Sequence, residues 1–308
     1  MSKNIENSPH VPIMQEEIVD NLVTDKSGIY IDCTLGFGGH TRAIYSKLNE
    51  NALVIGLDCD PDAYQYSKQK FRDNNSIKVF NENYTNYNKI LNKLDVDEVD
   101  GVLMDLGISS YQVDKEGRGF SYRFNSKLDM RFDLKYKKTA YDILNTYNVY
   151  DIGLIIKDYG EEKNYKNISE NIVKYSKKGN MNTTYDLKNA IIESTKYKAN
   201  MSKIFSRVFQ AVRIEVNSEF ENIKKMIESL PNRVKIGGKI IWLTFHSLED
   251  RLVKRATFSK NNQKIQTDYG EKKITLLSKK IIKPSRSEIL RNRRSRSAKL
   301  RGIVITEC

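Results

Sequence analysis

Short apolar runs alternate with amphipathic segments along the first third of the chain. The apolar runs cover residues 28–33, 52–57, 76–80 and 99–106, and helical periodicity covers residues 15–22, 41–48 and 61–71. Runs that are apolar throughout are typical of strands buried on both faces, as in a parallel sheet whose strands are connected by helices. The pattern therefore predicts an α/β, doubly wound, Rossmann-like sheet.

This alternation stops after residue 106 and resumes near residue 204. The intervening helical patterns cover residues 140–147, 149–176 and 185–195. Because no Pro/Gly/Ser-rich hinge brackets them, we expect an inserted all-helical cap domain rather than a second domain bounded by linkers. The expected division is a Rossmann-like core of residues 1–110 and 204–308 around an insertion of residues 111–203.

The last hundred residues contain one more helical stripe and three expected strands. The stripe is predicted to form one core-facing helix side and comprises Phe205, Val208, Phe209, Val212, Val216, Phe220 and Ile223. A polar row on the same segment, Gln210, Arg213 and Asn217, either faces a ligand crevice or is a solvated face. The strands are expected at residues 239–245, 274–282 and 303–306, and Ser247 with Asp250 predicts a helix capping box.

The turn after the first strand predicts a cofactor site. Asp32 ends the strand, and Gly36, Gly38 and Gly39 open the following helix, so the backbone can approach a ligand and present free N–H groups. A carboxylate before the glycines suits a cation, which favours S-adenosylmethionine over the pyrophosphate of NAD. Asp58 stands where an acid takes ribose hydroxyls in either cofactor, so an NAD-dependent oxidoreductase remains an alternative.

Two later strand ends supply further candidates. Asp105 ends the fourth strand, beside the switch point of a doubly wound sheet, and should face the ligand crevice. His246 and Arg251 follow the fifth strand, and local capping does not explain them. Tyr84 follows the third strand, where its ring would lie against an adenine or simply fill a half-buried edge.

The distribution of charge along the chain narrows the class of binding partner. The chain carries a net charge of +13, and residues 279–301 hold ten Lys or Arg with one acid, Glu288. A localised basic segment of this kind predicts a phosphate backbone as partner, and a solvated tail is the alternative. Cys33, Cys59 and Cys308 lack metal-ligand spacing and are interpreted as buried core thiols. With three histidines, no signal peptide pattern and no apolar run of about 18 residues, we expect a cytoplasmic protein without a metal or a membrane span.

An ordered set of motifs resembles the RsmH (MraW) family of small-subunit (16S) ribosomal RNA cytosine-N4 methyltransferases. The matching stretches are His10-x-Pro12, Asp32 to His40, Asp105 to Gln112, Arg118 to Ser121, Leu128 to Arg131, Gly160 to Glu162, Phe209 to Ile214, Phe245 to Arg251 and Arg296 to Arg301. The resemblance implies a class I methyltransferase sheet and N4 methylation of a cytidine in the decoding region. The implied cofactor contacts are Gly38, Gly39, His40, Asp58, Tyr84, Asp105 and Gln112. Tyr111 replaces a proline usual in the family, which leaves the shape of the target pocket open.

Methylating an exocyclic amine requires acceptors that hold its hydrogens, because its lone pair is delocalised into the ring. Asp105 is the candidate for this role, and His246 is the candidate proton acceptor or base contact. Four aromatic residues are candidate stacking surfaces for the flipped base: Tyr111, Phe120, Tyr122 and Phe124. Five arginines are candidate phosphate contacts: Arg118, Arg131, Arg251, Arg294 and Arg296.

Three questions remain open from the sequence. A non-catalytic RNA-binding protein is a competing interpretation of the same features. The partner is either naked small-subunit RNA or the assembled small ribosomal subunit, and the chain is either a monomer or a homodimer.

Overall fold

The computed structural model describes residues 12–195 and 200–308, so His10 of the first motif lies outside the described residues. The chain forms two compact units. The core unit comprises Met1–Gly107 and Phe220–Cys308, and the inserted unit comprises Ile108–Glu219. Segment 204–219, which the sequence pattern assigns to the core, therefore belongs to the inserted unit.

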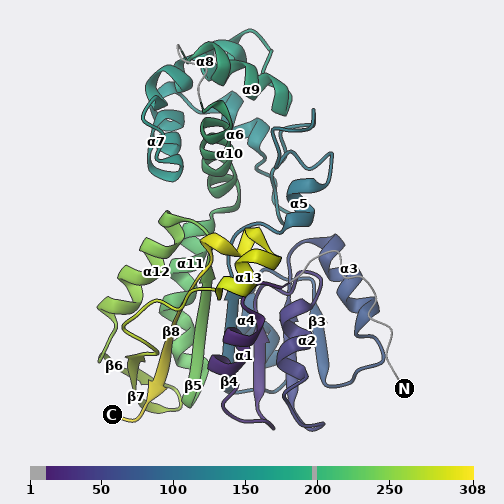
Figure 1. Ribbon diagram of the computed structural model, residues 1–308, viewed down its shortest axis with the longest axis vertical. Coiled ribbons are helices and arrows are strands. Elements are labelled where there is room, and N and C mark those ends of the chain that lie inside the picture. The colour runs from purple at the N-terminus through teal and green to yellow at the C-terminus, as the bar shows by residue number, and fades with distance from the viewer. Residues whose placement is uncertain (1–11, 196–199) are drawn as a thin grey trace. The chain divides into compact units, whose positions relative to one another are not determined.

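The core unit is built on one sheet, which has eight strands within the described residues (Figure 1). Five neighbouring strands are parallel: β3 (Ile77–Phe80), β2 (Leu53–Leu57), β1 (Ile29–Asp32), β4 (Val99–Asp105) and β5 (Val234–Thr244). They are followed by the antiparallel strands β8 (Lys299–Thr306), β7 (Gly270–Leu276) and β6 (Lys264–Thr267). The strand order reverses at the β1–β4 pair. The predicted doubly wound parallel sheet is confirmed.

The carboxyl-terminal strands differ from the prediction. β7 ends at Leu276, because Ile282 makes only an isolated bridge with Leu300. β6 was not expected, since its sequence Lys-Ile-Gln-Thr is polar and lies on the exposed edge of the sheet. An edge strand needs no continuous apolar run, so hydrophobic patterning gives a weak signal for it.

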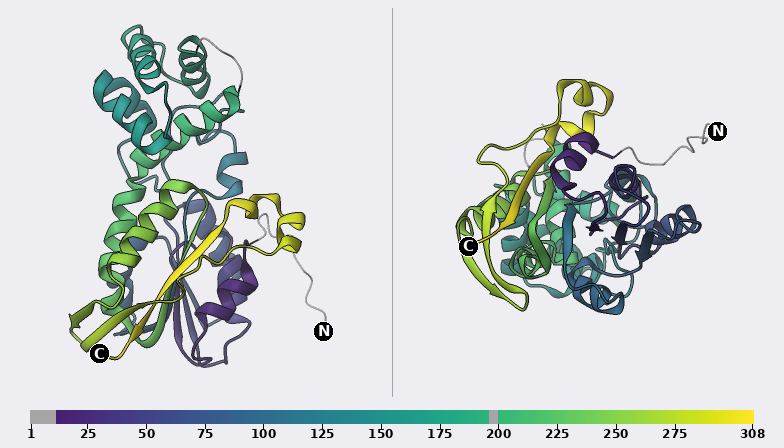
Figure 2. Two further views of the ribbon diagram at one scale, coloured as in Figure 1. Left: turned by 60° about the vertical axis from the view of Figure 1, so that its left-hand side comes forward. Right: turned by 90° about the horizontal axis from the view of Figure 1, so that it is seen from below.

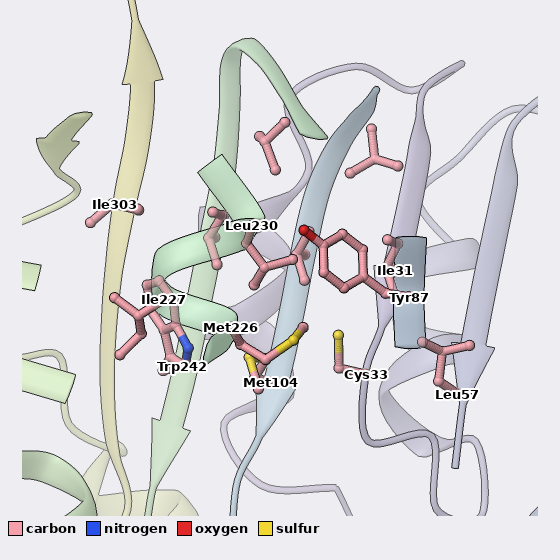
Figure 3. Packing of buried hydrophobic residues seen from close by; sticks show 14 of the residues in the cluster. Ile31, Cys33, Leu57, Tyr87, Met104, Met226, Ile227, Leu230, Trp242 and Ile303 are labelled. Atoms are coloured by element: carbon pink, nitrogen blue, oxygen red, sulfur yellow. The ribbon is translucent and has the colours of Figure 1, made fainter. Parts of the chain in front are cut away.

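Helices cover both faces of the sheet. The core-unit helices are α1 (Gln15–Leu22), α2 (Gly39–Tyr45), α3 (Pro61–Lys70), α4 (Tyr87–Lys93), α11 (Glu219–Ser229), α12 (Ser247–Ser259) and α13 (Arg286–Arg291), with 3-10 turns η1 (Tyr84–Asn86), η2 (Leu230–Arg233) and η3 (Arg293–Ser297). One face packs Tyr87 of α4 and Met226 of α11 against Trp242 and Met104 (Figure 3). The other face packs Ile18 of α1 and Ile44 of α2. No helix within the described ranges is both long and apolar enough to cross a membrane.

Only one of the three cysteines is a core thiol. Cys33 is buried beneath α4, and burial raises its pKa well above the usual range (Figure 3). Cys59 is half-buried and Cys308 is exposed, so the interpretation of all three as buried thiols is wrong for these two.

The inserted unit is helical and has a core of its own. Its helices are α5 (Ser110–Asp114), α6 (Ala140–Thr146), α7 (Val149–Gly160), α8 (Tyr165–Lys177), α9 (Thr184–Glu193) and α10 (Met201–Asn217). The single helical pattern over residues 149–176 is two helices, because Glu161 adopts a left-handed conformation with φ 50° that ends α7. Phe120 and Tyr122 pack in this core, Phe120 against Phe132 and Tyr122 against Phe205, which gives both rings a structural role.

The long apolar stripe is not one helix face. Ser218 has φ 50° and separates α10 from α11. As a result, Phe205 to Val216 pack in the inserted unit, whereas Phe220 and Ile223 pack in the core unit. The prediction of one continuous stripe is wrong because a left-handed serine leaves no mark in the periodicity.

The side chains of the polar row on α10 bond to other residues of the protein. Arg213 makes a two-point ion pair with Glu219, with distances of 2.7 and 3.0 Å. The side-chain amide of Asn217 donates to the Met130 carbonyl at 2.7 Å, and its oxygen accepts the Phe132 N–H at 2.7 Å. Asn217 therefore connects α10 to the loop before α6, and Arg213 connects α10 to the start of α11.

Candidate active site

The carboxyl ends of the parallel strands bring the predicted acids to one edge of the core unit. Asp32 ends β1, Asp105 ends the adjacent β4, and Asp58 directly follows β2 on the other side of β1. His246 follows the end of β5. In open α/β sheets, ligands bind at this edge beside the point where strand order reverses. The structure confirms the placement that strand patterning predicted.

The glycine loop has a backbone that other residues adopt at a cost. Gly36 and Gly38 have φ values of +51° and +70°. A Cβ on Gly38 would lie 2.4 Å from a ring carbon of Phe71. A Cβ on Gly39 would lie 3.1 Å from Pro12, so these two motif residues are close neighbours in the fold. Conformation therefore favours glycine at residue 36, space favours it at residue 39, and both require it at residue 38.

Helix α3 holds this loop from behind. The Ser67 hydroxyl donates to the Gly36 carbonyl at 2.8 Å, and Lys70 Nζ donates to the Phe37 carbonyl at 2.7 Å. Two carbonyls of the loop are thereby turned towards α3. The loop is fixed in shape by contacts within the core unit, as a preorganised binding loop should be.

Asp58 is joined to the loop through backbone donors. The Gly36 N–H donates to Asp58 Oδ2 at 2.7 Å, and the Asp60 N–H donates to Oδ1 at 2.8 Å. Burial raises the pKa of Asp58 to about 7, although these two N–H groups lower it. Each carboxylate oxygen keeps a second lone pair for a hydroxyl donor.

Asp32 organises the turn from inside. Its side chain is fully buried, accepts the Thr41 hydroxyl at 2.7 Å and accepts the Thr34 N–H at 3.2 Å. Burial raises its pKa, against the lowering effects of His40 and Thr41. Both oxygens therefore bond to the protein, so Asp32 acts on a ligand through its charge and through the loop it shapes.

His40 and Asp105 approach each other at the centre of this edge. His40 Nε2 lies 3.4 Å from Asp105 Oδ2, and the two side chains are 6% and 19% exposed. Within the described residues, Asp105 Oδ1 and both ring nitrogens of His40 are buried without a hydrogen-bond partner. Thr34 Oγ1 accepts the Asp105 N–H at 2.7 Å and fixes the end of β4. Buried polar atoms without partners are rare, and here they mark a place for a ligand.

His246 caps helix α12. Its side chain accepts the Glu249 N–H through Nδ1 at 3.4 Å, and its Nε2 lies 2.9 Å from Glu249 Oε1. The predicted capping box of Ser247 and Asp250 is wrong, because the helix begins one residue earlier with His246 as its N-cap. Glu249 was missed as a site residue, although its spacing of three from His246 is the capping signal.

This arrangement assigns the histidine proton. With Nδ1 accepting from the backbone, the neutral ring carries its proton on Nε2, next to the buried Glu249 carboxylate. No lone pair of the neutral ring is then left for a substrate proton. His246 therefore has a structural role as the cap of α12, and its role as proton acceptor or base contact stays a prediction.

Two predicted cofactor contacts have structural partners of their own, and cofactor contacts by both stay predictions. Tyr84 begins η1, is half-buried and packs against the apolar cluster beneath α4. Gln112 belongs to the inserted unit, where it forms a reciprocal capping box with Ser109 at the start of α5. A cofactor contact by Gln112 stays a prediction.

Arg118 and Arg131 brace a loop of the inserted unit. Arg131 makes a two-point ion pair with Asp129 and donates to the carbonyls of Leu134 and Tyr136. Arg118 donates to the Arg131 carbonyl at 2.9 Å. These contacts account for the two motifs without RNA, and phosphate contacts by these arginines stay predictions.

The other three arginines lie on the surface of the core unit. Arg251 is exposed on α12, and Arg294 and Arg296 are exposed in η3. The segment that carries the last two is tied down at two points. Asp250 accepts from Lys299 and Arg301 at 2.8 and 2.7 Å. Figures 1 and 2 show α13 beside α1, where Glu288 accepts the Met14 N–H at 2.6 Å.

Comparison with known proteins gives matches over nearly the whole chain. The sequence model of the MraW methylase family matches residues 7–306. Ribosomal RNA small subunit methyltransferase H of Caldicellulosiruptor saccharolyticus is 41% identical over 302 residues, covering 95% of this chain and 97% of the relative. The protein of that name from Fusobacterium nucleatum is 40% identical, covering 97% and 98%. A solved rRNA methylase from Streptococcus thermophilus gives a TM-score of 0.44 at 9% identity, covering 99% of this chain and 100% of that chain.

Proposed function

The chain belongs to the MraW methylase family and is an S-adenosylmethionine-dependent methyltransferase, and we propose that it methylates the N4 amine of a cytidine in the decoding region of small-subunit ribosomal RNA. The relatives described above are named for the small-subunit RNA and are about 40% identical over their full length. The single structural observation that carries the proposal is Asp105 at the switch point, with one buried oxygen that no described residue bonds.

The residues at the strand ends fit the cofactor. Gly36 and Gly38 give a loop that a ligand can approach closely, and Asp58 presents two acceptor oxygens to ribose hydroxyls. The charges of Asp32 and Asp105 suit a ligand that carries an amino group and a sulfonium. When bound, S-adenosylmethionine supplies an electrophilic methyl group, which the amine takes up with loss of one proton while the sulfonium leaves as a neutral thioether.

Asp105 is the proposed catalytic residue. Its Oδ1 can accept a hydrogen bond from the exocyclic amine, which draws the nitrogen lone pair out of conjugation with the ring and orients it. The same oxygen can take the proton that the methylated amine releases. His246 and Glu249 fix the neighbouring strand end, and a Cβ on Gly107 would lie 3.4 Å from Glu249 Oε1. Glu249 therefore packs against the turn that follows Asp105.

The proposed RNA interface is the basic segment of the core unit. Eight of its cations are exposed: Lys279, Lys280, Lys283, Arg286, Arg291, Arg293, Arg294 and Arg296. Lys299 and Arg301 are paired with Asp250 and serve to hold the segment. A fixed array of exposed cations suits a phosphate backbone, whose counterions it would release. This arrangement supports an RNA partner over a solvated tail.

A methyl-transfer assay tests the proposal. The purified chain is incubated with methyl-labelled S-adenosylmethionine and either naked small-subunit RNA or assembled small subunits, and the digested RNA is analysed for N4-methylcytidine. Asp105→Asn should lower kcat by about 100- to 1,000-fold. Asp73→Asn is the matched control, because the Asp73 side chain is 86% exposed.

The outcomes separate the alternatives. N4-methylcytidine made by the wild type and by Asp73→Asn, but not by Asp105→Asn, supports both the reaction and the catalytic role. RNA binding without any methylated nucleoside, on either substrate, would instead indicate a non-catalytic binding protein. Methylation at a different atom or base would overturn the assignment of N4.

A further inference from the structure

His40 occupies a place that ordinarily disfavours a cation. It lies in the first turn of α2, where the helix dipole repels positive charge, and its side chain is buried. Three acids offset this cost from three elements: Asp105 on β4, Asp32 on β1 and Glu288 on α13. Acids placed around a histidine in this way favour the protonated form of its ring.

We propose that His40 is a positioning residue, which holds Oδ2 of Asp105 and leaves Oδ1 as the acceptor for the substrate amine. The proposal rests on the catalytic role of Asp105 proposed above and gives the glycine-loop histidine a side-chain function towards the substrate. A cofactor contact through the His40 backbone is compatible with it, because the two roles use different atoms.

The geometry supports this division of labour between the two oxygens. His40 Nε2 lies 3.4 Å from Oδ2, the only described side-chain atom for which His40 has an ion-pair distance. Oδ1 is buried and has no hydrogen-bond partner among the described residues. A free carboxylate can rotate and exchange its two oxygens, whereas one held through Oδ2 presents Oδ1 in a constant direction. Such preorganisation is what the transition state of an amine methylation requires.

The charges around His40 also support its role in positioning Asp105. Burial lowers the pKa of His40, but the nearby carboxylate of Asp105 and the charges of Asp32 and Glu288 raise it above its usual value overall. These charges therefore favour the protonated form of His40 more than water favours that of a free imidazole. When protonated, the ring attracts the Asp105 carboxylate through opposite charge. A protonated imidazole has no lone pair, so the proton released by the amine goes to Asp105 and then to solvent.

Glu288 ties this pair to the basic segment. Its carboxylate accepts the Met14 N–H at 2.6 Å and contributes charge at His40. Because a glutamine oxygen can also accept the Met14 N–H, Glu288→Gln removes the charge and leaves the hydrogen bond possible. This variant isolates the electrostatic contribution of the basic segment to His40.

The first test reads His40 directly and needs no activity. The chain has three histidines, so His40 is assigned in the NMR spectrum of the labelled imidazoles from the signal that His40→Gln removes. In the wild type this signal should titrate above the usual histidine range. In Asp105→Asn it should titrate clearly lower, and in Glu288→Gln slightly lower. An unchanged titration in Asp105→Asn would overturn the proposal even if the methylation assay succeeds.

The second test measures turnover. His40→Ala should lower kcat by about 10- to 100-fold, with the Kd for S-adenosylmethionine, measured by calorimetry, changed by less than about 3-fold. His40→Gln, which restores an N–H donor without the charge, should recover part of kcat. Arg42→Gln is the control, because Arg42 is exposed on the same helix.

The pH profile distinguishes positioning from packing. Wild-type kcat should fall as pH rises through the pKa of His40, when the ring loses its charge, and His40→Gln should lack this alkaline decline. If His40→Ala weakens cofactor affinity and leaves kcat unchanged at saturation, His40 serves cofactor binding and the proposal is wrong. Failure of the wild type to methylate any RNA is a different result and counts against the proposed function alone.

Discussion

Substituting Gly38 by alanine should destabilise the core unit through two separable effects. Gly38 has φ +70°, and an L-residue in the left-handed region costs roughly 1–2 kcal/mol. Its new Cβ would lie 2.4 Å from Cε2 and 2.7 Å from Cζ of Phe71. Because Phe71 is 8% exposed and packed beneath the loop, relieving this overlap should cost about 1–3 kcal/mol. The expected loss of stability is the combination, about 2–5 kcal/mol.

Calorimetry and a double-mutant cycle measure the two parts. For a unit of this size, about 3 kcal/mol corresponds to a fall in melting temperature of about 6–12 °C. Gly39→Ala is the matched control, since its Cβ would meet Pro12 at 3.1 Å and its φ lies outside the left-handed region. It should cost clearly less than Gly38→Ala.

Phe71→Leu separates the overlap from the backbone strain. In the Phe71→Leu background, Gly38→Ala should cost at least about 1 kcal/mol less than in the wild type, because the smaller side chain relieves the overlap while the φ strain remains. The affinity for S-adenosylmethionine should fall in both Gly38→Ala variants. A melting temperature within about 1 °C of the wild type for Gly38→Ala would refute the reasoning from conformation and space.

Three further predictions concern charge. Burial raises the pKa of Asp58 to about 7 in the folded chain. Between about pH 4 and pH 7 the folded state therefore binds more protons than the unfolded state, so this group makes stability fall as pH rises through that range. Asp58→Asn should weaken this dependence in melting curves recorded across that range, and an identical pH dependence in the variant would contradict it. Asp250→Ala leaves Lys299 and Arg301 without their carboxylate and should cost about 3 kcal/mol of stability, measured by denaturant unfolding; a loss below about 0.5 kcal/mol would show the pairs to be unimportant. Arg294→Gln combined with Arg296→Gln should weaken RNA binding and reduce the slope of log K against log salt by roughly 1.4, whereas an unchanged slope would exclude phosphate contacts by both residues.

The sequence predicts local structure well where one segment decides it. Helix α1 has the predicted bounds of residues 15–22, and β1, β2 and β3 begin and end within one residue of their apolar runs. Apolar spacing is a property of a few consecutive residues, so it can be read from the chain. The breaks at Glu161 and Ser218 could not be predicted in this way. Neither is glycine or asparagine, and only tertiary packing selects their left-handed conformation.

The same distinction applies to the candidate site, where the sequence predicts some features and not others. That Asp32, Asp58 and Asp105 meet at one edge follows from strand patterning and the geometry of parallel sheets. Their individual partners do not follow from it. The approach of His40 to Asp105 joins residues on different elements, and the bond from Met14 to Glu288 joins residues 274 positions apart. Spacing in the sequence carries no information about such pairs.

The anchors of the basic segment determine what kind of RNA interface it can form. Asp250 holds its end through Lys299 and Arg301, and Glu288 holds α13 against the start of α1. A disordered basic tail would lose conformational entropy on binding RNA, and this segment has already lost that entropy on folding.

Because the basic segment is held in place, its distance from the glycine loop and Asp105 is fixed as well. Glu288 bonds to Met14, Pro12 packs against Gly39, and Gly39 precedes His40. RNA bound on the exposed cations would therefore lie against the same structural unit that carries the glycine loop and Asp105. Glu288, the one acid among ten basic residues, is then the residue that determines where the segment sits. Glu288→Ala should for this reason weaken RNA binding even though it makes the segment more positive, and a tighter complex would show that charge alone governs the interface.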